Sequence, residues 1–123
     1  NPKPITAGEH RAWFRTRLRG PNDCVLFIAD TPNGIPAGQV RFDRRDEAWE
    51  ISYAVAPPFR GRGVGQTMLA AAIEKFHEEH AKVTLFGQVK TDNVAPSRIF
   101  KALGFLAREA SPGRLVFEFS YGK

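Results

Sequence analysis

The hydrophobic and polar positions of this chain follow two different periods. Segments rich in β-prone residues and bounded by turn signals predict strands at 24–31, 37–43, 48–55, 82–90, 105–110 and 114–121. Apolar residues at helical spacing predict helices at 6–19, from Val64 to about residue 80, and at 93–103. No linker, repeat or low-complexity segment interrupts this order. We therefore expect one mixed α/β (α+β) domain over residues 1–123, in which helices flank a largely antiparallel sheet.

The prediction of a helix at 6–19 rests on a capping pattern at its start and on the spacing of its apolar residues. Thr6 is a candidate N-cap with Glu9 three positions later, which is a capping-box pattern. His10, Phe14 and Leu18 then recur every four residues and give the helix an apolar face. The next glycine and proline end it.

Composition and charge limit the classes of function. The chain is 42% hydrophobic and 25% charged, as is typical of soluble globular domains, and no apolar run approaches the roughly 20 residues that span a bilayer. The net charge of +5 favours an anionic partner, which leaves nucleic acid, a phosphorylated cofactor and an acidic substrate open. Nucleic acid is the least favoured of these, because the arginines are scattered and do not alternate with aromatic residues.

Cysteine and histidine usage indicates a cytoplasmic protein without a metal site. Cys24 is the single cysteine, so the chain has no internal disulfide, which fits a reducing compartment. His77 and His80 lie in the charged run EKFHEEH, and we expect both on a solvated helix face.

The segment with the clearest chemistry is RGRGVG, from Arg60 to Gly65, between a predicted strand and a predicted helix. Glycines at this place expose several backbone N–H groups at the positive end of the helix dipole, and arginines add charge suited to phosphate. The segment lacks the Gly-Lys-Ser/Thr ending of a Walker loop and the G-x-G-x-x-G spacing of a Rossmann site. It therefore predicts a phosphate site of another kind, or else a tight connection with solvated arginines.

This loop resembles the R/Q-x-x-G-x-G/A motif of the GNAT superfamily, the acyl-CoA-dependent N-acyltransferases. A second segment, from Asn93 to Gly104 and Phe105, resembles the Asn…Gly-Phe segment on a later helix of that family. The order of elements from residue 24 onward also follows the family. The resemblance implies a GNAT-like fold and acetyl-CoA as the co-substrate.

The resemblance also implies which residues bind the cofactor. Its pyrophosphate would lie on the loop, against Arg60, Gly61, Arg62, Gly63, Val64 and Gly65. Its pantetheine would lie where the strand before the loop splays from the strand at 83–90, paired with the backbone around Val55. Asn93 and Phe100, from the later helix, would lie beside it.

Acetyl transfer to an amine needs a base, a donor for the developing oxyanion and an acid for the leaving thiolate. Families of this fold often supply the base from the strand before the glycine loop, where Glu47 and Glu50 are available. Alternation puts them on opposite faces, and we take Glu50 as the candidate base. The alternative is an ion pair of Glu50 with Arg41 or Arg44 on the neighbouring strand. The backbone N–H near Val55 is the candidate oxyanion donor.

The general acid is where the chain departs from the family pattern. Many relatives have a tyrosine seven residues after the motif asparagine, and here that position is Phe100. Ser97, four residues after Asn93 on the same helix face, is a candidate substitute, and Tyr53, Tyr121 and water are others. A domain that binds acyl-CoA without catalysis also remains open.

The acceptor is suggested by a narrower resemblance. The segments GEHRAWF, GQVRFD and WEISYAVAP resemble GNAT enzymes that acetylate an amino group on a nucleotide-linked deoxy sugar. This resemblance implies acceptor contacts from His10, Arg41 and Tyr53. GNAT enzymes that act on the N-termini of ribosomal proteins share the first of these segments, so a protein acceptor stays open.

Family members usually begin with another strand and helix before the element predicted at 6–19, and we expect this chain to lack them. An uncovered sheet edge favours association, so a homodimer or a place in a larger bifunctional protein is expected.

Overall fold

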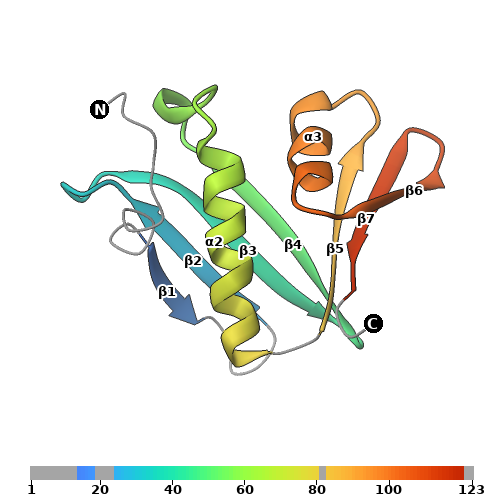
Figure 1. Ribbon diagram of the computed structural model, residues 1–123, viewed down its shortest axis with the longest axis horizontal. Coiled ribbons are helices and arrows are strands. Elements are labelled where there is room, and N and C mark those ends of the chain that lie inside the picture. The colour runs from blue at the N-terminus through green and yellow to red at the C-terminus, as the bar shows by residue number, and fades with distance from the viewer. Residues whose placement is uncertain (1–13, 19–23, 81–82, 121–123) are drawn as a thin grey trace.

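The computed structural model describes residues 14–18, 24–80 and 83–120, which form one sheet and its covering helices (Figure 1). The strands, in chain order, are β1 Phe14–Leu18, β2 Cys24–Asp30, β3 Pro36–Arg45, β4 Ala48–Val55, β5 Thr84–Lys90, β6 Leu106–Ser111 and β7 Arg114–Phe119. The helices are the short 3-10 turn η1 Pro57–Phe59, α2 Val64–Glu79 and α3 Val94–Ala102. Each strand and helix predicted from residue 24 onward is confirmed within the described residues, which leave out residues 82 and 121 at the ends of two predicted strands.

The helix predicted at 6–19 is wrong where the structure describes it. Phe14–Leu18 is strand β1, which pairs antiparallel with β2 from Phe14↔Ala29 to Leu18↔Val25. The spacing misled us because four residues is a multiple of the strand period as well as about one helical turn, and the segment FRTRL alternates cleanly. Residues 6–13 lie outside the described residues.

The sheet has the order β1-β2-β3-β4-β5-β7-β6, and β4 with β5 is its parallel pair. Backbone pairing between these two strands covers Ala48↔Thr84 to Glu50↔Phe86. Beyond Glu50, β4 follows β3 as far as Val55↔Gly38, whereas β5 follows β7 as far as Lys90↔Arg114. Figure 1 shows the two strands diverging from a common lower end. The splay implied by the family resemblance is therefore present.

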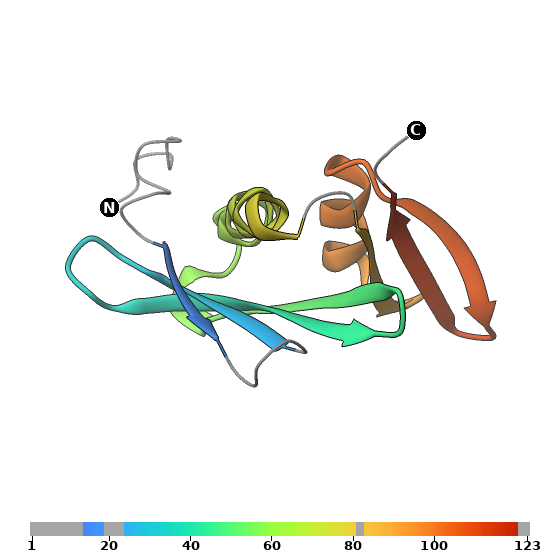
Figure 2. The same ribbon diagram turned by 90° about the horizontal axis from the view of Figure 1, so that it is seen from below.

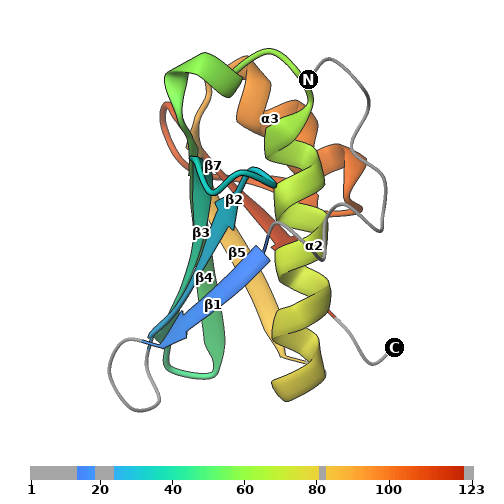
Figure 3. The ribbon, with the colours of Figure 1, turned by 90° about the vertical axis from the view of Figure 1, so that its left-hand side faces the viewer.

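Both helices lie on the same side of the sheet, as Figures 2 and 3 show from two directions. Helix α2 packs on β3 and β4, while α3 packs on β6 and β7. Gly38 allows α2 to approach closely, because an added Cβ would lie 2.8 Å from the Met68 sulfur and 2.6 Å from the Ala54 carbonyl oxygen. The N-terminal ends of α2 and α3 both lie at the open end of the split (Figure 1).

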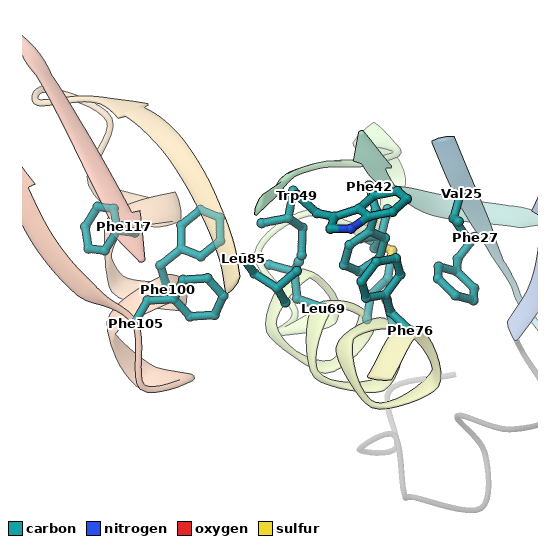
Figure 4. Close-up of a cluster of buried hydrophobic side chains, with 14 of the residues drawn as sticks. Val25, Phe27, Phe42, Trp49, Leu69, Phe76, Leu85, Phe100, Phe105 and Phe117 are labelled. Atoms are coloured by element: carbon teal, nitrogen blue, oxygen red, sulfur yellow. The ribbon is translucent and has the colours of Figure 1, made fainter. Parts of the chain in front are cut away.

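Each half of the sheet has its own aromatic cluster, and Leu85 lies between the two (Figure 4). Under α2, the rings of Phe42 and Phe76 stack with centroids 4.2 Å apart, and Trp49 meets Phe76 edge-on at 5.0 Å. Under α3, the members are Phe100, Phe105 and Phe117. Large apolar rings dominate the energetics of such cores, and both groups of rings belong with Leu85 to one continuous core.

The histidines of α2 are not on a solvated face as expected. His77 and His80 are half-buried, and the His80 ring stacks on Phe76 with centroids 4.4 Å apart. Burial lowers the pKa of His77, the nearby His80 adds to this, and a hydrogen bond with the Val83 backbone opposes it. The charged residues of EKFHEEH suggested exposure, but its two histidines lie at the edge of the apolar stripe and are partly covered.

Replacing Gly87 by alanine should destabilise the protein by about 1–3 kcal/mol, since the new Cβ would overpack the α3 cluster. An ideal Cβ at this position lies 2.6 Å from the Phe100 ring, which is itself fully enclosed. Urea unfolding of Gly87→Ala, Phe100→Leu and the double variant measures the effect. The double variant should lose less than the two singles combined, and strict additivity would contradict this packing.

Stability should fall as the pH drops from about 7.5 to about 5.5, because His77 resists protonation when folded. The unfolded chain takes up a proton near the ordinary histidine pKa of 6.5, while the folded chain does so only at lower pH. The pKa shift therefore stabilises the fold above pH 6.5 and ceases to do so as the pH falls through the folded value. His77→Gln should weaken this slope in urea titrations, and an unchanged slope would disprove the assignment.

Candidate active site

A pocket of about 1070 Å³ fills the split between β4 and β5. Its walls are residues 50–55 of β4, residues 88–90 of β5, the glycine loop with the first turn of α2, and residues 95, 96 and 98–100 of α3. Two helices thus point their N-terminal ends at one pocket. Neither α2 nor α3 has a side-chain capping bond or an acidic residue in its first turn, so the positive ends of both dipoles are available to an anion.

The glycine loop takes a conformation that depends on its glycines. Gly61 has φ 78° and Gly63 has φ 76°, and Gly63 is the left-handed N-cap of α2. Gly65 is constrained by space and not by its backbone angle, since an added Cβ would lie 3.2 Å from Ile99 and 3.3 Å from Tyr53. Gly61, Gly63, Val64 and Gly65 all line the pocket. The loop therefore brings its backbone to the pocket wall as the sequence predicts for a phosphate site.

Arg60 and Arg62 have different positions in this loop. The Arg60 Nε donates to the Val55 carbonyl at 2.9 Å, so its side chain bends back across the end of β4 and lines the pocket. Arg62 is exposed, and it is not among the residues of the pocket wall. Of the two arginines flanking Gly61, Arg60 is therefore the one whose side chain lines the pocket.

The backbone of Val55 faces the split. The N–H of Ala56 bonds to the Ala37 carbonyl of β3 at 2.8 Å. Successive residues of a strand direct their backbone groups to opposite edges, so the N–H and carbonyl of Val55 point away from β3. The contact from Arg60 agrees with this direction. The Val55 amide is thus placed to pair with an extended ligand in the split.

Glu50 lies at the closed end of the split, where the backbone pairing of β4 and β5 stops. Its Oε1 accepts from Arg45 Nε at 3.2 Å, and its Oε2 accepts from Gln88 Nε2 at 3.1 Å. The side chain is 23% exposed. The ion pair that the sequence left open is real, but the partner is Arg45 rather than Arg41 or Arg44. Arg41 instead pairs with Asp43 at 2.9 Å.

Tyr53 and Phe100 meet at the helix side of the pocket. Their ring centroids are 6.2 Å apart, edge to face, and both residues line the pocket wall. Phe100 is only 2% exposed and is mainly a core residue. Burial raises the pKa of the Tyr53 phenol. The phenol of Tyr53 therefore carries its proton into a pocket whose other ring, Phe100, has none to give.

Several other predicted site residues are not brought to this pocket. The Ser97 hydroxyl donates to the Asn93 carbonyl at 3.3 Å, and Ser97 is absent from the pocket wall, so the structure does not support it as the acid. Arg41 is 54% exposed and lies outside the pocket. Asn93 does line it and makes no capping bond with its side chain. His10 lies outside the described residues.

Sequence reasoning missed other polar residues of the pocket wall, which are Ser52, Gln66, Gln88, Lys90, Arg98 and Arg114. Gln88 and Lys90 are exposed positions that alternate with the buried Gly87 and Val89 in β5. This alternation was visible in FGQVK and marks side chains that face away from the core. In the part of the chain that the structure describes, no His, Cys, Asp and Glu cluster could hold a metal, and no helix is long and apolar enough to cross a membrane.

The family model for the acetyltransferase (GNAT) domain matches residues 1–106 of this chain. Among curated proteins, the chain is similar to the [ribosomal protein bS18]-alanine N-acetyltransferase of Salmonella typhimurium, with 37% identity over 60 residues. This alignment covers 49% of the chain and 40% of that protein, so the chain spans well under half of its curated relative.

Solved structures share the fold at low sequence identity. The ribosomal-protein-S5-alanine acetyltransferase of Vibrio fischeri matches with TM-score 0.69 and 15% identity, over 80% of this chain and 62% of that one. The N-acetyltransferase PseH of Campylobacter jejuni matches with TM-score 0.71 and 15% identity, over 83% of this chain and 71% of that one. Likeness at this identity supports the fold, and the residues of the pocket must support the chemistry.

Proposed function

The chain belongs to the GNAT acetyltransferase family, and we propose that it transfers an acetyl group from acetyl-CoA to a primary amine. The observation that supports this most directly is the pocket in the β4–β5 split, with the glycine loop at its open end and Glu50 at its closed end. A long, anionic thioester fits such a pocket from one end to the other.

The proposed cofactor contacts follow from the two helix ends and the strand edge. The pyrophosphate lies against the N–H groups of the loop from Arg60 to Gly65 and beside the Arg60 guanidinium. The Val55 backbone pairs with pantetheine amides, and Asn93 and Phe100 form the wall contributed by α3. Bound acetyl-CoA supplies the activated acetyl thioester.

In this proposal, three groups of the chain handle protons and charge. Glu50 accepts the proton of the incoming amine, directly or through a water molecule. The N–H of Val55 donates to the oxygen on which negative charge develops. Tyr53, whose phenol burial keeps protonated, replaces Ser97 as the donor to the leaving thiolate. Each of the three lines the same pocket wall.

The acceptor class is the finer part of the proposal. An amino group on a nucleotide-linked deoxy sugar is an anionic acceptor, which the net charge of +5 favours. The alternative is a protein N-terminus, which is supported by similarity to the two ribosomal-protein alanine acetyltransferases. Phe100 keeps a third candidate open, an acyl-CoA-binding module that does not catalyse.

Arg60→Ala should weaken acetyl-CoA binding about tenfold, because the variant loses both a charge and the bond that holds the loop against Val55. Calorimetric titration of the purified protein measures the dissociation constant. Arg62→Ala is the matched control: it removes an arginine from the same loop, and its side chain lies outside the pocket wall. Equal losses in both variants would indicate a general charge effect and not the proposed contact.

Glu50→Gln should lower kcat by about 10²–10³-fold while leaving the affinity for acetyl-CoA nearly unchanged, since general bases contribute in that range. Thiol release with a panel of amines measures the rate; the panel contains 4-amino sugar nucleotides and N-terminal alanine peptides. Glu47→Gln is the control, because Glu47 is exposed and absent from the pocket wall. Tight acetyl-CoA binding with no turnover of any amine would favour the non-catalytic module.

A further inference from the structure

The Gln88 side chain joins β5 to β4 by a hydrogen bond beyond the end of their backbone pairing. The last backbone pair is Glu50↔Phe86, and two positions further along β5 the Gln88 amide donates to Glu50 Oε2 at 3.1 Å. From this geometry we propose that Gln88 is a positioning residue, which holds the Glu50 carboxylate in the split for proton transfer. The proposal rests on the proposed function, in which Glu50 is the base.

The packing of β5 leaves the Gln88 side chain outside the core, where it lines the pocket beside Glu50. Its neighbours Gly87 and Val89 are buried, and Gly87 abuts the Phe100 ring. Gln88 itself is exposed and lies on the opposite face of the strand, away from the α3 cluster. Its bond to Glu50 spans 38 positions of sequence and joins the two halves of the sheet. A residue that only stabilised the strand would not need this partner.

The two donors on Glu50 are of different kinds. Arg45 contacts Oε1 from the end of β3, with a side chain that is 57% exposed and thus strongly solvated. Gln88 contacts Oε2 from across the split. Donors on both oxygens fix the rotation of the carboxylate plane, and each oxygen keeps a second lone pair for an incoming proton. A neutral amide does this without adding a second charge beside the base.

One substitution, tested in two backgrounds, separates loss of the hydrogen bond from loss of side-chain volume. Gln88→Met keeps the length of the side chain but removes the donor, and it should lower kcat about 5- to 30-fold with less than a twofold change in the KM for acetyl-CoA. In the Glu50→Gln background the same substitution should add less than a twofold loss, since there is no longer a base to position. Full activity of Gln88→Met, or an equal loss in both backgrounds, would overturn the proposal.

Glu50 already lies opposite Asp43 in the register of β3 and β4, and Arg45 contacts its Oε1. Gln88→Glu places a further carboxylate at Oε2, and carboxylates that share one site do not ionise independently. The acidic limb of the kcat/KM profile should therefore move up by about one pH unit or more. Gln39→Glu is the matched control, because Gln39 is an exposed glutamine on the neighbouring strand β3 and is absent from the pocket wall. An unmoved acidic limb in Gln88→Glu would contradict the contact.

A measurement without turnover separates this proposal from the proposed function. The carboxyl carbon of Glu50, assigned with Glu50→Gln, can be followed by NMR in ¹³C-labelled protein as the pH is lowered. Its titration midpoint should rise by about one unit or more in Gln88→Glu and stay constant in Gln39→Glu. If the wild type acetylates no amine, the proposed function fails, and this titration still decides whether Gln88 holds the carboxylate. An unchanged midpoint would overturn the positioning role.

Discussion

The arrangement depends on one constraint, the early end of backbone pairing between β4 and β5. Each strand is already held on its other side, β4 by β3 and β5 by β7, and each half of the sheet carries its own helix and aromatic cluster. The two halves therefore diverge at the open end of the split while one continuous core still runs beneath both helices. The backbone groups on the free edge of β4 then need partners, as the Arg60 contact with the Val55 carbonyl illustrates. An extended ligand with its own amide groups could form those hydrogen bonds.

The periodic part of the structure could be predicted from the sequence, and the side-chain partnerships could not. Alternation in AWEISYAV correctly separated the buried Trp49 and Ile51 from Glu50. The partners of Glu50, by contrast, depend on register: Arg45 is five positions away across a hairpin, and Gln88 is 38 positions away across the split. No local pattern encodes such a distance. The helix prediction failed at residues 14–18 for another reason, because the spacing of the apolar residues there fits both the helical and the strand period.

The position of Phe100 shows how a motif residue can serve packing. By resemblance we expected a residue beside the cofactor, conspicuous for lacking a hydroxyl. The ring does line the pocket, but it is almost completely buried against Phe105, Phe117 and Gly87. Gly87 on β5 and Phe100 on α3 are therefore one packing unit, since the ring occupies the space that a side chain at position 87 would fill. A side chain at position 87 and the ring at position 100 cannot both be accommodated.

The short seam from Ala48↔Thr84 to Glu50↔Phe86 has a mechanical consequence for the described part of the chain. These backbone pairs fix the register of the two strands, but beyond them side chains hold the halves together, such as the Gln88 bond to Glu50 and the contact of Tyr53 with Phe100. One continuous core also runs beneath both helices. The width of the split therefore depends on the side chains that cross it, and substitutions there should change that width while the register of β4 and β5 stays the same.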